Sequence, residues 1–215
     1  MIGNDVVDLD DPESRSAARH ARFDARAFTV AEQTMLRTSA DGERLRWVLW
    51  AAKESAYKAA RRDDTRVTFA PGRVAVVPDR EGATGFVGEP RHADAGVRYS
   101  VYVDGRRFRV QVRVGAGYAH ALACAADARV GTLWSAIARV PGVTTASPGA
   151  LVRRLAIALL AGALREPPAA LAIVRVGRMP LLTVRGRSAP LTLSLSHHGG
   201  YVACACAAPA RGGVG

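Results

Sequence analysis

A long helix followed by several strands is predicted twice along this chain of 215 residues. The first helix spans about Glu43 to Arg61, where apolar side chains recur at helical spacing. The second starts at Ser147, a capping residue before Pro148, and continues to about Leu164. Each series of strands closes on a similar segment: Gly-Tyr-Ala-His-Ala-Leu-Ala-Cys-Ala-Ala from residue 117 and Gly-Tyr-Val-Ala-Cys-Ala-Cys-Ala-Ala from residue 200. This echo predicts an α+β fold of two similar halves, residues 1–130 and 131–215.

Shorter elements are predicted in the first half from local patterns. The first ten residues are expected to form a strand that ends on acidic residues, and Thr29 and Glu32 make a capping box that starts a helix. A glycine-rich polar loop is expected over residues 79–95. Further patterns predict a helix over Arg15–Ala27, a strand over Val67–Val77 interrupted by Pro71-Gly72, a hairpin over Tyr99–Val112 around Asp104-Gly105, and a strand over Tyr118–Ala125.

The second half is predicted to open with a short helical piece, Leu133–Arg139, and a linker rich in Pro, Gly, Thr and Ser. Two halves within one chain make a monomer the expected state. After the second long helix, apolar runs predict strands at Ala172–Val176, Leu181–Val184, Leu191–Leu195 and Tyr201–Cys206.

Charge and composition restrict the kind of partner. The formal net charge of +11 favours acidic partners, such as phosphorylated cofactors and acidic proteins. The arginines are scattered and only 6% of residues are aromatic, unlike the basic arms and stacking platforms of nucleic-acid-binding proteins. The longest apolar run, about ten residues, is too short to cross a membrane, and no signal peptide is visible. Three cysteines without a C-x-x-C pair indicate reduced, buried thiols in a cytoplasmic protein.

Both lysines of the protein, Lys53 and Lys58, lie in the first long helix. At helical spacing Trp50, Glu54 and Lys58 form one row beside the core face, where a cleft can form. One interpretation is a surface Glu–Lys pair that contributes about 0.2–0.5 kcal/mol. The other is a functional pair, because an ammonium group differs chemically from the guanidinium groups that the chain uses elsewhere.

A few other polar residues interrupt apolar surroundings. Asp5 lies in the first strand, and a Ser-His-His run that includes His197 follows an apolar strand near the other end of the chain. Asp5 is either a strand-end carboxylate in water or a metal ligand beside the core. Asp5 and Glu54 suit Mg²⁺, while Lys58 and His197 suit phosphate oxygens. These groups are suited to a displacement reaction at a phosphate. The sequence has no Walker loop, so an ATP-type phosphate site is not expected.

Four segments carry a resemblance to one family. They are Gly3-Asn-Asp5-Val-Val-Asp8, Trp50-Ala-Ala-Lys53-Glu54-Ser-Ala-Tyr-Lys58, Gly177-Arg178-Met-Pro180-Leu181 and Ser196-His197-His198. In that order they resemble the G-x-D, W-x-x-K-E-x-x-x-K, G-[KR]-P-x-L and S-H-S segments of the 4′-phosphopantetheinyl transferases. The lysine–glutamate segment is the most specific of the four.

The resemblance implies a pseudo-twofold pair of similar α+β halves with the active site between them. It also implies transfer of the phosphopantetheine arm of coenzyme A to a serine of an apo acyl or peptidyl carrier protein, leaving 3′,5′-ADP. The carrier is expected to be acidic. Fatty-acid, polyketide and nonribosomal peptide synthesis all stay open as its pathway, and neither nucleic acid nor a membrane is an expected partner.

The same resemblance assigns roles to individual residues. Glu54, Lys58 and His197 are the candidate catalytic residues, with Glu54 or a metal-linked water accepting the serine proton and Lys58 and His197 binding phosphates. The candidate Mg²⁺ ligands are Asp5, Glu54 and Asp8. Besides Lys58 and His197, coenzyme A is expected to contact Lys53, Arg153, Arg154, Arg178 and Ser196.

The sequence departs from the family pattern in three ways. Val7 occupies the position of a second acid, on the same strand face as Asp5, so that Asp8 or water has to complete a metal site. His198 replaces a serine, and Met179 interrupts the Gly-Arg-Pro run. The halves also follow one another in exchanged order, with the lysine–glutamate motif first.

Two other functions remain as alternatives. An arginine-rich module that docks on nucleic acid or an acidic partner would not need Glu54, because a carboxylate repels phosphate unless a cation lies between them. A degenerate homologue that binds coenzyme A or a carrier without catalysis is the second alternative, and the absence of an acid at Val7 keeps it open.

Overall fold

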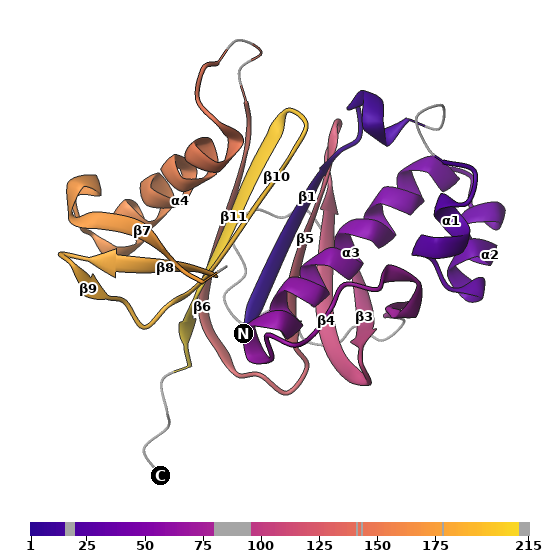
Figure 1. Ribbon diagram of the computed structural model, residues 1–215, viewed down its shortest axis with the longest axis horizontal. Helices are drawn as coiled ribbons and strands as arrows, with labels where there is room; N and C mark the ends of the chain where they lie inside the picture. The colour runs from indigo at the N-terminus through magenta and orange to yellow at the C-terminus, as the bar shows by residue number, and fades with distance from the viewer. Residues whose placement is uncertain (16–19, 80–95, 141, 143, 178, 211–215) are drawn as a thin grey trace.

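The structure is a computed structural model that describes residues 1–15, 20–79, 96–140, 142, 144–177 and 179–210. The glycine-rich loop expected over residues 79–95 therefore lies outside the described residues, except for Asp79. Within the described part of the chain, two long helices, α3 (Gly42–Asp63) and α4 (Pro148–Leu164), each pack against antiparallel sheets (Figure 1). Both helices closely match their predicted ranges.

The first half is built on a five-stranded sheet covered by α3. The strand order is β1 (Ile2–Asp8), β5 (Tyr118–Ala125), β4 (Arg106–Val114), β3 (Val97–Val103) and β2 (Ala75–Pro78). The β3–β4 hairpin and β5 confirm the predicted strands, and Gly105 takes the positive φ of 78° that the hairpin turn requires. Leu49, Ala52 and Ala56 of α3 are fully buried against this sheet, as the helical spacing predicts.

Gly3 allows β1 to lie directly against α3. A Cβ atom at Gly3 would meet the backbone oxygen of Ser55 at 2.0 Å and the backbone nitrogen of Ala59 at 2.7 Å. Because a glycine permits this close approach, Asp5, two residues further along β1, faces the helix at the level of Lys58.

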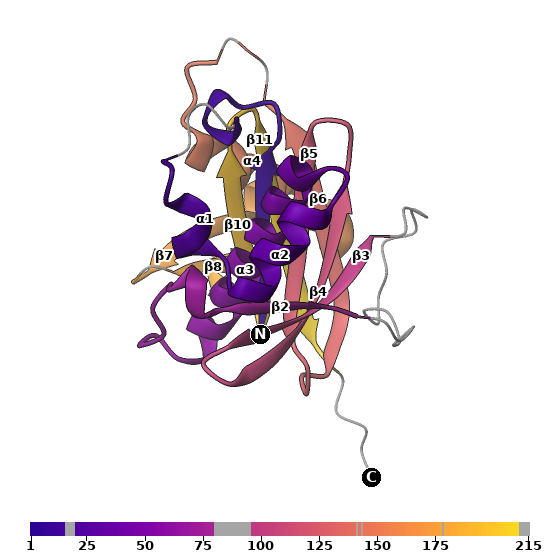
Figure 2. The same cartoon turned by 90° about the vertical axis from the view of Figure 1, so that its right-hand side faces the viewer.

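Short helices cover the outer side of the first half, facing the viewer in Figure 2. The helix α2 (Val30–Thr38) starts at the predicted capping box of Thr29 and Glu32. The helix predicted over Arg15–Ala27 is shorter, since α1 spans only Phe23–Ala27 after a 3-10 turn at Pro12–Ser14, and residues 16–19 are not described.

The strand predicted over Val67–Val77 is mostly wrong. Its first part is irregular and then forms the 3-10 turn Pro71–Arg73, so only β2 is a strand. Pro71 has no N–H to donate to a neighbouring strand, and a helical turn tolerates proline at its first position.

The second half contains two three-stranded sheets next to α4. One has the order β10 (Thr192–His198), β11 (Tyr201–Pro209) and β6 (Val130–Arg139); the other has the order β7 (Leu171–Val176), β8 (Met179–Val184) and β9 (Arg187–Ser188). The helical piece predicted over Leu133–Arg139 is wrong, because β6 pairs with β11 along this whole segment. A short apolar run has no decisive period, so pairing with a long neighbouring strand determines its conformation.

The two halves share one pairing pattern. In each, the first strand pairs antiparallel with the last, β1 with β5 and β6 with β11, and the long helix packs on that pair. The two similar sequence segments are β5 and β11, and the rings of Tyr118 and Tyr201 at their starts lie 5.3 Å apart. This agreement favours two related halves, whose pseudo-twofold relation and boundary near residue 130 stay predictions.

A row of side chains joins β10 to β1. Ser194 Oγ, Ser196 Oγ and His198 Nδ1 accept hydrogen bonds from the backbone N–H groups of Asn4, Val6 and Asp8, respectively. Alternate residues of both strands are matched in the same direction, so the two strands run parallel, side by side (Figure 1). This row sets the position of His197 relative to the first half.

None of the helices within the described ranges combines the length and hydropathy needed to span a bilayer. Cys124, Cys204 and Cys206 are free and buried, as predicted.

Candidate functional site

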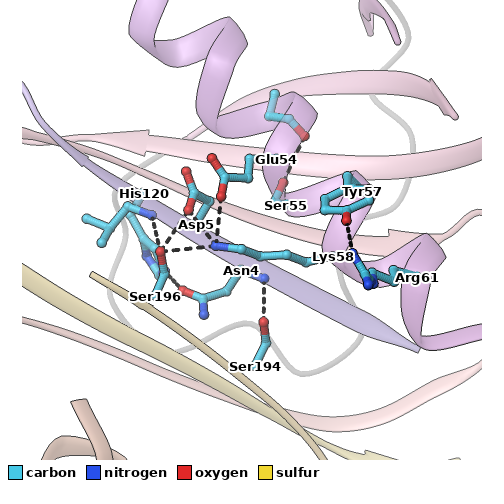
Figure 3. A network of polar contacts seen from close by, with 12 residues as sticks. Asn4, Asp5, Glu54, Ser55, Tyr57, Lys58, Arg61, His120, Ser194 and Ser196 are labelled. Carbon is cyan, nitrogen blue, oxygen red and sulfur yellow. Dashed lines mark hydrogen bonds and ion pairs between the residues drawn. The ribbon is translucent and has the colours of Figure 1, made fainter. Parts of the chain in front are cut away.

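The helix α3 and the strand β1 bring Asp5, Glu54 and Lys58 together. Lys58 Nζ lies 2.7 Å from Asp5 Oδ1 and 3.4 Å from Glu54 Oε1. Figure 3 shows the Lys58 side chain reaching from α3 so that its nitrogen contacts both carboxylates. Asp5 is buried, whereas about a quarter of Lys58 and 30% of Glu54 remain exposed. The isolated surface pair is therefore too simple an interpretation, because the ammonium group also serves a buried carboxylate.

Ser196 adds a residue of the second half to this group. Its hydroxyl donates to Asp5 Oδ1 at 2.7 Å, while Lys58 Nζ donates to Ser196 Oγ at 3.2 Å. Ser196 also accepts the hydrogen bond from the N–H of Val6. Ser196 thus orients Asp5 and links β10 to β1. It lines the smaller cavity beside Asp5 and not the larger, basic cavity.

The charges in this cluster change the proton affinity of its members. Burial raises the pKa of Glu54, and the neighbouring charge of Asp5 raises it further, against the opposing effect of Lys58. Burial alone would lower the pKa of Lys58, but the charges of Asp5 and Glu54 outweigh it and raise that pKa. Glu54 is therefore a stronger base than an exposed glutamate, and Lys58 keeps its proton.

His197 lies at the boundary between two cavities. Partial burial lowers the pKa of His197, and the positive charge of Lys58 lowers it further, so the neutral ring is favoured at neutral pH. A neutral imidazole retains one N–H that can donate to a phosphate oxygen.

The two cavities differ in size and lining. The smaller cavity, about 280 Å³, is lined by Asp5, Glu54 and Lys58 together with Val6, Val7, Trp50 and residues 195–198. The larger, about 680 Å³, lies between the C-terminal part of α3, the start of α4, and strands of the second half. Lys58, Leu195 and His197 line both cavities, so an elongated ligand in the larger one can reach the carboxylates.

The larger cavity is strongly basic. Its described lining has no carboxylate and carries the basic side chains Lys58, Arg61, Arg62, Arg153, Arg175 and His197. Arg62 donates to the carbonyl oxygen of Leu193, and burial lowers the pKa of Arg62. A guanidinium without a carboxylate beside it in a cavity is suited to an anionic ligand, and phosphate matches its fork of donors.

Lys53, predicted to contact coenzyme A, lies elsewhere. Its side chain has no exposed surface, and Nζ donates to Glu32 Oε2 at 2.6 Å and to the carbonyl oxygens of Ala27 and Pro71. One residue along a helix turns the side chain by about 100°. Glu54 consequently faces the cleft while Lys53 faces the core, which corrects the prediction for Lys53.

The remaining predicted residues divide between the two cavities and other places. Arg153 lines the larger cavity, whereas Arg154 is exposed on α4 outside it. Asp8 is not a ligand in this arrangement, because its carboxylate accepts hydrogen bonds from the N–H groups of Asp10 and Gly200. It points to the opposite face of β1 from Asp5, as strand alternation requires. Arg178 lies outside the described residues.

Among the residues that line the larger cavity, four with basic or aromatic side chains were missed. Arg61 and Arg62 follow Lys58 by three and four positions on the same helix, so helical spacing alone could have added them. Tyr57 contacts Arg61 through its hydroxyl and its ring. Arg175 is brought to the cavity by β7, and nothing in its local sequence marks it.

The donor set fits a hard divalent cation that keeps other ligands. Asp5 and Glu54 are close enough to share Lys58, and two carboxylates with waters and phosphate oxygens form a common Mg²⁺ arrangement. Val7 lines the smaller cavity where a further acid would help. The described residues contain no group of three or more His, Cys, Asp or Glu that could hold a metal ion on their own.

A pair of carboxylates beside a basic cavity is an arrangement suited to a phosphorylated ligand next to a cation. A model of the 4′-phosphopantetheinyl transferase superfamily matches residues 1–123, and the chain belongs to that superfamily. Its members transfer phosphopantetheine and generally use coenzyme A as substrate, typically with Mg²⁺. No curated protein matches the chain. The matched range contains Asp5, Glu54 and Lys58 and ends in β5, so the exchanged order of the halves stays a prediction.

Proposed function

We propose that this protein transfers the 4′-phosphopantetheine arm of coenzyme A to a serine of an apo acyl or peptidyl carrier protein, releasing 3′,5′-ADP. The observation that supports it most directly is the position of Lys58 and His197. Both line the wall that separates the carboxylates from the basic cavity. A phosphate placed at this wall can be reached from both sides.

The basic cavity is the proposed site of the 3′,5′-ADP portion. Its volume of about 680 Å³ lies within the range of small-molecule and cofactor sites. Arg62 and Arg153, from helices of different halves, would bind phosphates there, and Lys58 and His197 would contact the pyrophosphate. The pantetheine arm would then extend past the carboxylates towards the smaller cavity.

In the proposed reaction the serine oxygen attacks the phosphorus atom that carries the pantetheine arm. The bond from that phosphorus to the bridging oxygen breaks, and 3′,5′-ADP leaves with the electron pair. Glu54, or a water that it orients, accepts the serine proton, as its raised pKa favours. Lys58 compensates the charge that develops on the leaving oxygen. Asp5 and Glu54 would hold Mg²⁺, which when bound supplies further charge neutralisation at the phosphates.

The carrier protein is proposed to be acidic. The chain has a formal net charge of +11, and arginines surround the larger cavity. Complementary charge would steer an acidic carrier to this face and speed association. We further propose that the two halves, residues 1–130 and 131–215, form the site between them.

Intact-mass measurement tests the proposal. Purified protein, coenzyme A and Mg²⁺ are incubated with apo carriers of fatty-acid, polyketide and peptide type, and the mass of each carrier is recorded. We expect at least one carrier to gain one phosphopantetheine group on serine. If a known transferase modifies the same carriers and this protein modifies none, the proposal is wrong. Coenzyme A binding by calorimetry would then identify an inactive homologue that still binds the ligand.

A further inference from the structure

Lys58 contacts both of the carboxylates that would hold a metal ion, Asp5 and Glu54. Its Nζ lies 2.7 Å from Asp5 Oδ1 and 3.4 Å from Glu54 Oε1, and Ser196 Oγ is 3.2 Å away. Asp5 and Glu54 are the residues that would hold a divalent cation, and Lys58 already contacts one oxygen of each. The ammonium group and an ion would therefore compete for the same two carboxylates, because two cations held at short range by one pair of acids repel each other.

We propose that Lys58 is an internal counter-cation that keeps the Asp5–Glu54 pair in a low-affinity state for metal until the phosphates of the ligand draw its ammonium group into the larger cavity. The identity of the ligand as coenzyme A rests on the proposed function. The competition itself rests only on the contacts of Lys58 and on its position in both cavity walls.

The number of acids makes the competition effective. Two carboxylates and one ammonium group have a net formal charge of only −1, and Val7 adds no third acid to the smaller cavity. A dication that enters while Lys58 stays in place meets a positive charge at close range. Removal of that charge from the two carboxylates restores a net charge of −2, which attracts the ion more strongly.

The larger cavity offers Lys58 an alternative partner. The side chain is long and flexible and already lines this cavity, so a phosphate there can bind the ammonium group without a change in the backbone. Ligand binding would then raise metal affinity, and metal binding would raise ligand affinity by the same factor. The metal site is consequently completed by the ligand and not preformed.

Mn²⁺ binding in the absence of coenzyme A tests the inference. Free Mn²⁺ is measured by electron paramagnetic resonance in titrations of the wild type and of Lys58→Met, which keeps the stem and removes the charge. We expect the variant to bind Mn²⁺ about tenfold more tightly. Lys58→Gln, a second neutral variant, is expected to do the same. Lys58→Arg retains the charge and is expected to stay within about twofold of the wild type.

Arg61→Met is the matched control for net charge. Arg61 lines the larger cavity but not the smaller one, so its removal lowers the protein charge equally without freeing the carboxylates. A gain in Mn²⁺ affinity equal to that of Lys58→Met would overturn the inference. Unchanged or weaker Mn²⁺ binding by both neutral variants of Lys58, shown to be folded by circular dichroism, would overturn it as well.

A second titration separates this inference from the proposed function. With 3′,5′-ADP present, the wild type is expected to bind Mn²⁺ more tightly, and the gain is expected to be smaller for Lys58→Met. If no protein binds Mn²⁺ with or without 3′,5′-ADP, both the inference and the metal assignment fail. If the wild type modifies a carrier while neutral variants of Lys58 gain no metal affinity, only the inference fails.

Discussion

At the scale of single residues, the surroundings of Glu54 change its chemistry most directly. Its pKa is raised by burial and by the charge of Asp5, while its position one turn from Lys58 keeps it at the cleft. Trp50, one turn earlier in the same row, lines the smaller cavity with it. These contacts place the predicted helical row along one cavity, which spacing alone could not establish.

We predict that Glu54→Gln reduces transfer at least about a hundredfold, because the variant loses the proton acceptor. Its melting temperature should match or exceed that of the wild type, since the change removes a half-buried charge that faces Asp5. Turnover with an apo carrier and thermal unfolding measure the two effects. Glu13→Gln, at an exposed position, is the control. Transfer within about tenfold of the wild type would rule out the assigned role.

His120 is a second residue whose burial has a measurable consequence. It contacts Asn4 Oδ1 through Nε2 at 3.1 Å, and burial followed by the charges of Arg113 and Lys58 lowers its pKa from 6.5 to about 4. The unfolded chain therefore binds the proton first as the pH falls. The stability that the neutral ring contributes is complete above pH 6.5 and is lost between pH 6.5 and about 4.

We predict that this residue alone accounts for a loss of roughly 3 kcal/mol over that interval. Urea unfolding of the wild type and of His120→Gln at several pH values measures the difference, since glutamine can still donate to Asn4. The variant should show a shallower decline in stability. Equal slopes for both proteins would exclude His120 as the cause.

At the scale of elements, the pair of Lys53 and Glu32 joins the parts of the first half. Glu32 accepts hydrogen bonds from the N–H groups of Thr29 and Val76. Lys53 donates to Glu32, to the carbonyl oxygen of the last residue of α1 and to that of Pro71, which begins a 3-10 turn. Every donor of the ammonium group is used. These hydrogen bonds hold α3 against α1, α2 and β2. They therefore also hold Glu54, the next residue of α3, in its position relative to β1.

We predict that Lys53→Met lowers the free energy of unfolding by about 3–5 kcal/mol, because it leaves the carboxylate of Glu32 buried without its cation. Denaturant unfolding gives this value. The double variant Lys53→Met/Glu32→Gln should be more stable than the sum of the single changes indicates. At a temperature where Lys53→Met is folded, its affinity for coenzyme A should equal that of the wild type. A weaker affinity would restore the original assignment of Lys53 to the ligand.

At the scale of the whole molecule, the larger cavity is lined by elements far apart in the sequence, from α3 to β10. Arg62 comes from α3 and donates to the carbonyl oxygen of Leu193 in β10, and Arg153 comes from α4. The side-chain row between β1 and β10 sets the distance between these groups. A site of this kind depends on how the halves pack, and not on either half alone.

We predict that Arg153→Met raises the KM for coenzyme A about tenfold with a smaller effect on kcat, because a charge-assisted contact to phosphate contributes about 1.5–3 kcal/mol. Arg154→Met is the matched control, since it removes the same charge from the next position of α4 outside the cavity. Steady-state kinetics with varied coenzyme A measure both. Equal effects of the two changes would indicate a general electrostatic contribution only.

Much of the local structure could be predicted from the sequence. The capping box at Thr29, the Asp104-Gly105 hairpin and the long helices depend on contacts within a few residues, and each was found in place. The row of Trp50, Glu54 and Lys58 follows from helical period in the same way. The motif residues Asp5, Glu54, Lys58 and His197, singled out from the sequence, line one cavity.

The tertiary structure alone decided which strands pair and which way certain side chains point. The segment Leu133–Arg139 is a strand because β11 lies beside it, and its own pattern does not distinguish strand from helix. Lys53 faces the core and Asp8 faces the turn between β10 and β11 because of packing partners distant in sequence. Sequence by itself determines the local period and the chemical groups available. Long-range packing determines which of those groups share a cavity, since burial and charge depend on neighbours that the local chain does not contain.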